Sequence, residues 1–245
     1  MKSPVSAWYE AGGYRVHARV GGRPDGPPIV LVHGIAVSSR YMVPLARELG
    51  SWAHVYAPDL PGFGRSAKPP RALGVSALAG ALEAWLDAAE LERPALVANS
   101  FGCQVAVELA ASRPERISHL VLVGPTIDLY ARRRRVQVAR WLRTALVERP
   151  PLHFVVARDA LAAGVVRSWQ TFGHALADPV ELKLPGITVP ALVVRGERDP
   201  LASQAWSEEV ARLLPNGQLV VIPGAGHALN WSRPRELGRL VRELL

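Results

Sequence analysis

The sequence predicts an α/β protein with a mainly parallel sheet and helices on both faces. Continuous apolar runs, typical of strands buried on both faces, recur along the chain, and helical patterns separate them from residue 28 onwards. The exception is a stretch from about 126 to 187, which has helical character and no strong strand signal. We therefore expect one sheet-based core that is interrupted by a helical insertion.

The expected elements follow one another in a regular order. Strands at 5–10 and 14–20 form an antiparallel hairpin through Gly12 and Gly13. Later strands are expected at 28–32, 54–57, 95–97, 117–123, 191–195 and 218–222, and helices at 38–49, 75–91, 104–111 and 233–245. The predicted core domain comprises 1–125 and 188–245, and the predicted helical cap is 126–187. Parallel sheets bind ligands at the edge formed by the strand C-termini, so we expect the cap to fold over that edge.

The composition is that of an ordinary globular protein. The 245 residues are 49% hydrophobic and 20% charged, which is enough for a sizeable core. The single cysteine, Cys103, excludes an intramolecular disulfide. The first residues lack the apolar run of a signal peptide, and no stretch reaches the roughly 18–20 apolar residues of a membrane span. We therefore expect a soluble cytoplasmic protein with no membrane span.

The strong positive charge raises the question of polyanionic partners. The formal net charge is +8, and most basic residues are arginines spread along the chain. The one dense run is Arg132 to Arg135, extended by Arg140 and Arg143. A solvated helix face explains this run, and an acidic substrate or a polyanion is the alternative. We expect no nucleic-acid partner, because such a role leaves the motifs described next unexplained.

The most informative motif lies between Leu96 and Gly102, where the end of a buried strand meets the start of a helix. Ser100 stands on the turn, and the small residues Ala98 and Gly102 lie two positions before and after it. Such a turn projects the serine hydroxyl out of the backbone at a helix N-terminus, where free N–H groups stabilise a developing anion. The motif indicates a nucleophilic serine, and a serine that only caps the helix is the alternative.

A nucleophilic serine needs a base that takes its proton and an acid that orients the base. Among the seven histidines, His227 lies in a glycine-rich loop after the last strand, which can deliver an imidazole to the carboxyl edge of the sheet. Asp199 follows the preceding strand at the same edge and is the expected acid. Asp128, which follows the 117–123 strand, has an equivalent position and is its competitor.

Acyl transfer also requires N–H donors aimed at the oxyanion, each of which lowers the barrier by roughly 3 kcal/mol. The backbone N–H of Phe101, directly after the serine, is the first candidate. The second is the N–H of Ile35, in the turn after the third strand, where Gly34 allows a close approach of the backbone. These two groups form the predicted oxyanion hole.

Five segments of the chain together resemble the α/β-hydrolase superfamily. They are His33-Gly34-Ile35, Asp59 to Ser66, Ala98 to Gly102, Gly196 to Pro200 and Gly224 to His227. Serine, aspartate and histidine also appear in the family's order along the chain. The resemblance implies an eight-stranded sheet with a helical cap between the sixth and seventh strands. Glycine is commoner in the family at the position of Ala98, and alanine is small enough for the same turn.

The nucleophile separates activities within this superfamily. Similar dehalogenases and epoxide hydrolases have an aspartate at the turn, whereas this chain has Ser100. The resemblance therefore implies a carboxylesterase-type enzyme that cleaves esters through an acyl-serine intermediate, with Ser100, His227 and Asp199 as the catalytic triad. It implies no cofactor, and the scattered histidines and single cysteine have no metal-ligand spacing.

The helical insertion offers candidates for the substrate pocket. Tyr130, Trp141, Trp169 and Phe172 belong to the insertion, and Trp231 lies four residues after His227. A mostly apolar cleft fits small-molecule esters of short, medium or aromatic acids. The arginines of the insertion leave an acidic substrate as the alternative.

Two other functions remain compatible with the sequence. Similar carbon–carbon bond hydrolases of aromatic ring-fission products use the same triad, often with a cap arginine and a tryptophan near the histidine. Arg167, Trp169 and Trp231 are the candidates for those positions. A ligand-binding signalling protein with slow or absent turnover is the third possibility, and the sequence makes no prediction of the oligomeric state.

Overall fold

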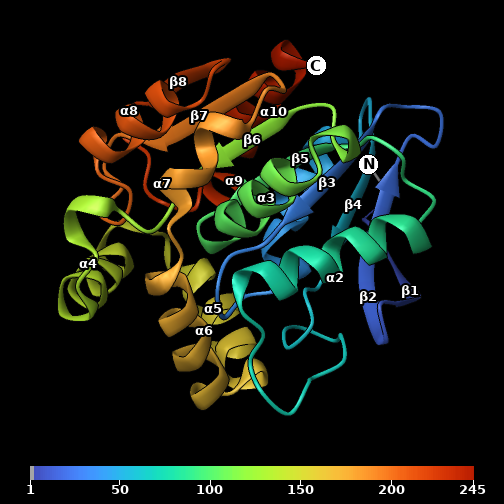
Figure 1. The fold of residues 1–245 in the computed structure, drawn as a ribbon, viewed down its shortest axis with the longest axis horizontal. Helices are drawn as coiled ribbons and strands as arrows, with labels where there is room; N and C mark the ends of the chain where they lie inside the picture. Colours follow the sequence, from blue (N-terminus) through green and yellow to red (C-terminus); the bar gives the residue numbers. More distant parts are fainter. Residues whose placement is uncertain (1–2) are drawn as a thin grey trace.

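A single eight-stranded sheet forms the centre of the protein, in the order β1-β2-β4-β3-β5-β6-β7-β8 (Figure 1). The structure is a computed structural model and describes residues 3–245. The strands are β1 Val5–Ala11, β2 Tyr14–Gly22, β3 Pro28–Val32, β4 His54–Pro58, β5 Ala95–Asn99, β6 Leu120–Val123, β7 Ala191–Gly196 and β8 Gly217–Ile222. Strand β2 pairs antiparallel with β1 and β4, and all other neighbours are parallel. The predicted fold class is confirmed.

Helices cover both faces of the sheet. They are α1 Val43–Leu49, α2 Val75–Ala88, α3 Phe101–Ser112, α8 Gln204–Leu213, α9 Leu229–Ser232 and α10 Pro234–Leu244, with the short 3-10 helices η1 Ser39–Met42 and η2 Pro114–Arg116. The side chains of α2, α3 and α8 join one apolar cluster, and those of α1, α9 and α10 join a second cluster on the opposite face. Fully buried Trp85 and Trp206 anchor the first cluster. A fully buried Leu or Ile in either cluster contributes roughly 1.5–3 kcal/mol.

The central strands are apolar on both faces because helices cover both faces. Every residue of β5, β6 and β7 is buried, whereas the edge strand β8 is only partly buried. The parallel strands end at the same edge of the sheet, so residues that directly follow β3, β5, β7 and β8 are brought together there. This edge is where the predicted site residues lie.

Three element boundaries differ from the sequence prediction by three residues. Helix α3 begins at Phe101 rather than at residue 104, because the sharp turn at Ser100 leads directly into the helix. Helix α2 ends at Ala88 rather than 91, and Glu90 then adopts a φ of 55°, a left-handed conformation typical of the residues that follow a helix. Strand β6 begins at Leu120 rather than 117, because Ile117 still closes η2.

Helices and the loops that join them form the segment between β6 and β7, which contains no strand of the described chain. It contains η3 Leu129–Ala131, α4 Arg134–Val147, α5 Pro150–Ala163, α6 Val165–Ala177, α7 Val180–Lys183 and η4 Leu184–Gly186. Figure 1 shows α4 to one side of the sheet and the paired helices α5 and α6 below its carboxyl edge. Helix α5 contacts the core at η1. The exact boundaries 126–187 stay a prediction, and within 3–245 no helix is long and apolar enough to cross a membrane.

Candidate active site

Ser100 lies on a strained turn between β5 and α3. Its φ of 57° and ψ of −125° fall in a backbone region that residues other than glycine rarely adopt. Holding a residue in that region costs of order 1–3 kcal/mol. A Cβ atom at Gly102 would lie 2.6 Å from the carbonyl oxygens of Val32 and His33, so the close approach of α3 to β3 requires glycine there. Backbone strain held in place by such tight packing is typical of functional sites.

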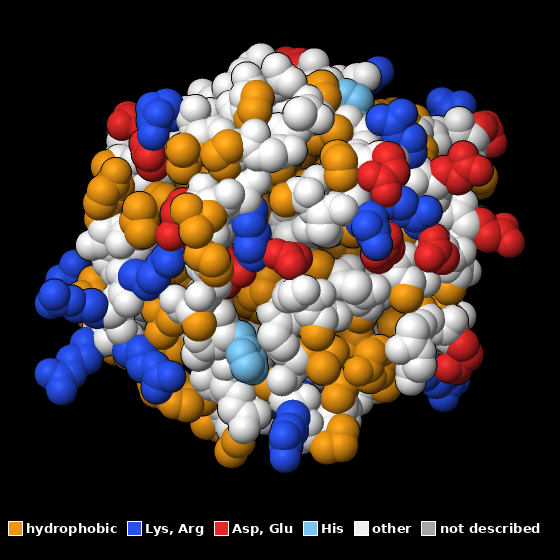
Figure 2. Space-filling model, in the orientation of Figure 1, with side chains coloured by type: hydrophobic (Ala, Val, Ile, Leu, Met, Phe, Trp, Pro, Cys, Tyr) orange, Lys and Arg blue, Asp and Glu red, His pale blue; other side chains and the backbone are white. Residues whose placement is uncertain are grey.

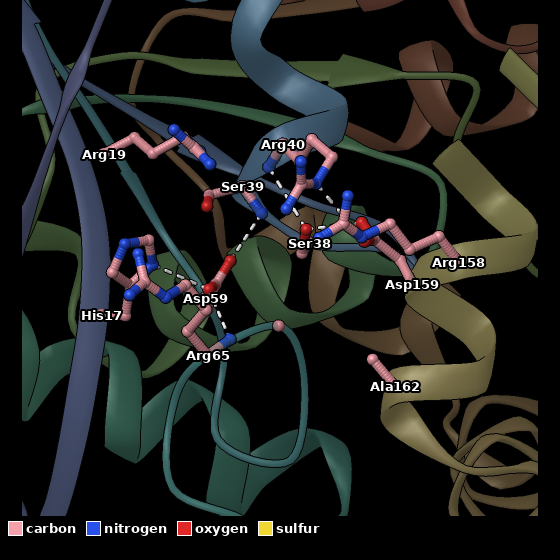
Figure 3. Close-up of a pocket in the computed structure, with 11 residues that line it drawn as sticks. His17, Arg19, Ser38, Ser39, Arg40, Asp59, Arg65, Arg158, Asp159 and Ala162 are labelled. Atoms are coloured by element: carbon pink, nitrogen blue, oxygen red, sulfur yellow. Dashed lines mark hydrogen bonds and ion pairs between the residues drawn. The ribbon is translucent and has the colours of Figure 1, made fainter. Parts of the chain in front are cut away.

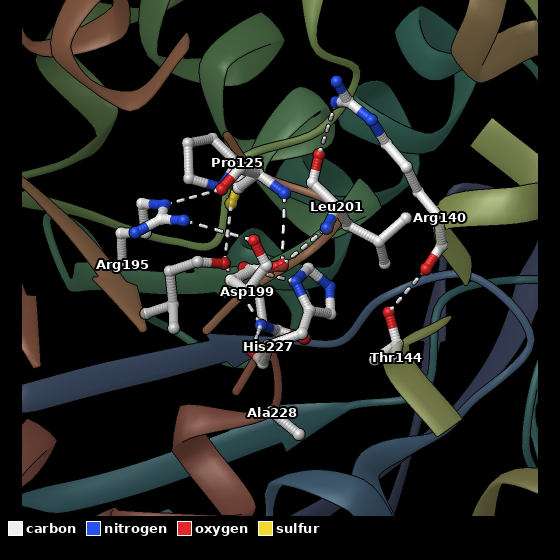
Figure 4. A network of polar contacts seen from close by, with 12 residues as sticks. Pro125, Arg140, Thr144, Arg195, Asp199, Leu201, His227 and Ala228 are labelled. Atoms are coloured by element: carbon white, nitrogen blue, oxygen red, sulfur yellow. Dashed lines mark hydrogen bonds and ion pairs between the residues drawn. The ribbon is translucent and has the colours of Figure 1, made fainter. Parts of the chain in front are cut away.

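His227 and Asp199 form a hydrogen-bonded pair. The Nδ1 atom of His227 lies 2.7 Å from Asp199 Oδ2, and both side chains are buried (Figure 4). Asp199 Oδ1 accepts hydrogen bonds from the backbone N–H groups of Leu201 and Ala202, at 2.8 and 3.1 Å. With Nδ1 donating to the carboxylate, Nε2 of the neutral imidazole is left as the proton acceptor. Within residues 3–245, this Nε2 is buried and has no hydrogen-bond partner.

Ser100 and His227 line the same cavity. The Ser100 hydroxyl is not hydrogen-bonded to His227 Nε2, because that nitrogen has no partner among the described residues. Such hydrogen bonds are often long in unliganded enzymes and tighten in the complex with substrate. The arrangement therefore places a half-buried serine and an imidazole oriented by a carboxylate around one cavity.

The pKa of His227 is set by opposing effects. Burial lowers the pKa, but the charge and hydrogen bond of Asp199 and the charge of Glu148 raise it by more, so the net pKa lies above the usual value for histidine. An imidazole with a raised pKa binds a proton more readily and is neutral only at somewhat higher pH.

Asp128, the competing acid of the sequence analysis, belongs to a different network. Its side chain pairs with Arg140, accepts a hydrogen bond from Ser203 Oγ at 2.7 Å, and caps η3 through the Tyr130 N–H at 2.9 Å. The carboxylate that contacts His227 is that of Asp199.

Hydrogen bonds join the loop after β7, which carries Asp199, to the loop after β8, which carries His227 and is called the base loop below. Arg198 N donates to Ala225 O at 2.9 Å, and Gly224 N donates to Glu197 Oε2 at 2.7 Å. Arg195 in β7 also holds this turn, because its Nη2 donates to the carbonyl oxygen of Asp199 at 3.2 Å (Figure 4). The two loops therefore behave as one unit at the edge of the sheet.

Gly124, directly after β6, makes room for the acid–base pair. Its φ is +55°, and a Cβ atom there would lie 2.9 Å from His227 Nδ1 and 3.0 Å from Asp199 Oδ2. The sequence analysis did not single out this glycine. Its position at the end of a central strand was the available signal.

Asn99 and Tyr41 form a buried support beneath the site. Asn99 Nδ2 donates to Val123 O at 3.1 Å and to His227 O at 3.3 Å, and its Oδ1 accepts from the Tyr41 hydroxyl at 3.0 Å. Burial raises the pKa of Tyr41 well above its usual range, so its hydroxyl keeps the proton that it donates. Asn230 Nδ2 in turn donates to Tyr41 O at 2.9 Å. Only Asn99, next to the serine, lay within a motif that the sequence singled out.

Glu148 connects the helical insertion to the base loop. It follows α4, is buried, and accepts a hydrogen bond from Ala228 N at 2.8 Å through Oε1. A Cβ atom at Gly226 would lie 2.4 Å from the same oxygen, which explains the glycine beside His227. No sequence pattern marks Glu148, because its role depends on a contact across 80 residues.

The turn predicted to hold the oxyanion donor lies against the serine. A Cβ atom at Gly34 would be 3.2 Å from Ser100 Cβ, and Ile35 lines the cavity. Buried His33 fixes this turn, because its Nδ1 donates to Gly34 O at 2.8 Å while Nε2 accepts from Leu60 N at 3.0 Å. Phe101 is the first residue of α3, where backbone N–H groups have no acceptor within the helix.

The cavity beside Ser100 has a volume of about 320 Å³ and is lined mainly by apolar groups. Of the five predicted pocket residues, Trp141 lines it. Tyr130 and Trp169 are largely exposed, Phe172 packs on the first apolar cluster, and Trp231 packs on the second. The lining contributed by α5 instead consists of smaller residues: Leu152, His153, Val156, Ala157 and Ala160.

No arginine lines this cavity in the described part of the chain, whereas Glu148 does. Arg167, considered above for a carbon–carbon hydrolase, donates to the carbonyl oxygens of Pro69 and Arg71 instead. Cys103 is buried one turn after the serine, and burial raises its pKa far above the usual value. Residues 3–245 contain no group of three or more His, Cys, Asp or Glu side chains that could hold a metal ion.

Comparison with known proteins agrees with this architecture. Residues 29–240 match the model of the alpha/beta hydrolase family. Esterase YbfF of Escherichia coli (strain K12) is 26% identical over 89% of this chain and 92% of its own length. A putative carbamate hydrolase, RutD of Klebsiella pneumoniae subsp. pneumoniae, is also 26% identical, over 90% and 91%.

A solved structure shares the fold. The thermophilic esterase from Thermogutta terrifontis superposes with a TM-score of 0.83 at 24% identity, covering 98% of this chain and 97% of that protein. The family match spans most of the chain, and the relatives are esterases and hydrolases. The protein is therefore a hydrolase enzyme and belongs to the alpha/beta hydrolase family.

Proposed function

We propose that this protein hydrolyses carboxylic esters through an acyl-serine intermediate on Ser100. The observation that carries the proposal is the state of His227. Its Nδ1 is hydrogen-bonded to Asp199, its Nε2 has no hydrogen-bond partner among residues 3–245, and His227 lines the cavity that Ser100 also lines. An imidazole oriented in this way accepts a proton from the serine hydroxyl, which is otherwise a poor nucleophile.

In the proposed acylation step, Ser100 Oγ attacks the ester carbonyl and its proton passes to His227 Nε2. The resulting imidazolium is stabilised by Asp199, whose second oxygen stays engaged with two backbone N–H groups. The N–H groups of Ile35 and Phe101 would bind the oxyanion, each lowering the barrier by about 3 kcal/mol. Collapse of the tetrahedral intermediate breaks the bond to the alkoxy oxygen, which takes the proton from His227 and leaves as the alcohol.

Deacylation repeats the same steps with water as the nucleophile. His227 Nε2 takes a proton from water while the hydroxide attacks the acyl carbon. The proton then returns to Ser100 Oγ as the bond to the acyl group breaks and the free acid leaves. The apolar cavity of about 320 Å³ favours neutral acyl groups of short to medium length.

The test is hydrolysis of p-nitrophenyl acetate, butyrate, octanoate and laurate by the wild type and by Ser100→Ala. Loss of the nucleophile is expected to lower kcat by about 10⁶-fold, to the background level. The chain length with the highest kcat/KM reports the size of the acyl pocket. Absence of wild-type turnover on all four esters would sink the proposal.

Two aspartate variants separate the proposed acid from its competitor. Asp199→Asn is expected to lower kcat about 10⁴-fold, because the amide no longer fixes the correct tautomer of His227. Asp128→Asn removes a charge from the Arg140 network instead and should leave kcat within a few fold. The opposite ranking of the two variants would transfer the acid role to Asp128.

A further inference from the structure

A second cavity lies on the other side of α5 from the catalytic one. It has a volume of about 120 Å³ and is enclosed by β2, η1, the loop after β4 and α5. Four arginines line it: Arg19, Arg40, Arg65 and Arg158. Figure 3 shows the side chains of Arg19, Arg40 and Arg158 converging around Ser38 and Ser39. Nothing in the proposed ester reaction uses this cavity.

The two carboxylates in this cavity do not neutralise the four arginines. Asp59 accepts from His17 Nδ1 at 2.8 Å and from the backbone N–H groups of Ser39 and Arg65 at 2.6 and 2.8 Å. These interactions outweigh burial and lower the pKa of Asp59, so it is a carboxylate that is already fully engaged. Four arginines and two aspartates line the cavity, so the arginines leave a formal excess of two positive charges.

Both carboxylate oxygens of Asp159 also have partners within the protein. Its Oδ2 accepts from the hydroxyl of Ser38, and its Oδ1 lies 3.7 Å from Arg40 Nε. Among the ion pairs within residues 3–245, none involves Arg19, Arg65 or Arg158. Arg65 extends along the rim instead, where its Nη1 donates to Ser6 Oγ at 3.1 Å. Three guanidinium groups at this cavity thus lack a carboxylate partner.

The deepest of these groups is also incompletely hydrogen-bonded. Arg19 Nε is buried without a hydrogen-bond partner in the described chain. Arg40 Nε also has no hydrogen-bond partner there. Burial and the neighbouring charges of Arg40 and Arg65 lower the pKa of Arg19 by more than the charges of Asp59 and Asp159 raise it. A buried donor without an acceptor costs about 1–3 kcal/mol, so an anion that accepts these bonds would be bound favourably.

We propose that this cavity binds a phosphate group. A phosphate carries close to two negative charges at neutral pH and offers several acceptor oxygens, matching the excess of two positive charges and the guanidinium donors. A carboxylate would neutralise only half of that excess. The volume is well below the 300–1,000 Å³ of pockets for whole small molecules, so the cavity takes a phosphate group and not the body of a larger ligand.

Such a ligand would join the helical insertion to the core. Arg158, Asp159 and Ala162 of α5 line the phosphate cavity, whereas Val156 and Ala160 of the same helix line the catalytic cavity. The other walls of the phosphate cavity belong to the core, through β2 and η1. A bound phosphate would therefore hold α5 against the core and fix one wall of the ester pocket.

Isothermal titration calorimetry tests the proposal without relying on ester hydrolysis. Inorganic phosphate and glycerol 3-phosphate are titrated into the wild type at equal ionic strength, with sodium chloride as the blank. Binding of inorganic phosphate supports a site for the free ion, and binding of glycerol 3-phosphate alone supports a site for the phosphate end of a larger molecule. Absence of heat with both ligands would overturn the proposal.

Two variants locate the binding. Arg158→Gln is on the exposed side of the cavity and Arg19→Gln is deeper, and each should weaken binding at least tenfold because each removes a charge-assisted hydrogen bond. Arg143→Gln removes an exposed arginine of α4 that lines neither cavity and should leave the affinity unchanged. Equal weakening by all three variants would show general charge attraction and contradict a defined site. If Arg19→Gln fails to fold, Arg158→Gln still decides the question.

Discussion

At the scale of single residues, Glu148 is a charged group beside the proposed triad that the sequence did not predict. It lies in the catalytic cavity, holds the base loop through Ala228 N, and raises the pKa of His227 together with Asp199. His227 must be neutral to accept the proton of Ser100, so kcat/KM should rise with pH through the pKa of His227. This pKa lies above the ordinary value for histidine.

Glu148→Gln should therefore shift the acidic limb of the pH profile of kcat/KM to lower pH. The amide keeps an oxygen that accepts from Ala228 N but removes the charge that raises the pKa of His227. Glu197→Gln is the matched control, because Glu197 also accepts a backbone N–H of the base loop but is not among the groups that shift this pKa. A limb that stays in place or moves to higher pH in the Glu148 variant contradicts the electrostatic role.

Gly124 is the second residue-scale determinant, and Gly124→Ala should lower kcat about 10²-fold. A methyl group there would press on both His227 Nδ1 and Asp199 Oδ2, and small displacements of aligned groups are costly in rate. In Gly80→Ala the new methyl group meets nothing within 4 Å in the middle of α2, so that variant should retain kcat and gain roughly 0.5–1 kcal/mol of stability. Steady-state kinetics and thermal denaturation check both, and an active Gly124→Ala would show that the pair tolerates displacement.

At the scale of secondary-structure elements, α5 decides the shape of both cavities. One side of this helix presents small residues, Ala157 and Ala160, to the ester pocket, and the other presents Arg158 and Asp159 to the phosphate cavity. The five pocket residues predicted from the sequence are all aromatic, and Trp141 is the one of them that lines the cavity. The α5 wall consists mostly of aliphatic side chains, and Trp169 of α6 is largely exposed.

Ala160→Phe should therefore shorten the acyl chains that the enzyme accepts. We expect kcat/KM for the octanoate ester to fall about tenfold or more while that for acetate changes little, since the added ring occupies the wall of the pocket. Leu161→Phe places the same ring on the neighbouring exposed position and serves as the control. An unchanged chain-length profile in Ala160→Phe would mean that the acyl group does not lie against α5.

At the scale of the whole molecule, the charge is unevenly distributed. Residues 126–187 contain ten basic and five acidic residues, and every acidic side chain among them is at least partly buried and engaged in a hydrogen bond or ion pair. Figure 2 shows basic side chains gathered over α4 at the lower left, with no acidic side chain among them. The surface of the insertion is therefore cationic, whereas the catalytic cavity contains Glu148 and no arginine of the described chain.

The cationic surface of the insertion favours negatively charged substrates, whereas Glu148 in the cavity disfavours them. We expect the effect of Glu148 to be the larger one. Surface charges are screened over about 8 Å at physiological ionic strength, while two like charges roughly 8 Å apart in the site repel by about 2 kcal/mol at an effective dielectric constant of 20. We expect kcat/KM for p-nitrophenyl butyrate to exceed that for the negatively charged p-nitrophenyl succinate monoester by about tenfold or more. Glu148→Gln should narrow the difference, and a preference of the wild type for succinate would favour an acidic physiological substrate.

The sheet, the order of its strands along the chain and the residues that follow each strand could be predicted from the amino-acid pattern alone. Apolar runs identify central strands because both of their faces are covered, and the carboxyl ends of parallel strands necessarily meet at one edge. That rule alone located Ser100, Asp199 and His227 at a common edge, with Asp128 as an equal candidate beside Asp199. The end of α2 at Ala88 and the start of α3 at Phe101 depended on positive φ angles that residue type alone does not predict.

Which side chains contact one another within that edge became known from the three-dimensional packing. Asp199 rather than Asp128 contacts His227, because Arg140 and Ser203 engage Asp128. Glu148 reaches Ala228 across 80 residues, and the arginines of the phosphate cavity lie on three separate elements and one loop. Contacts of this kind depend on how helices pack on the sheet, and a single contact between distant polar groups leaves no periodic pattern in the sequence.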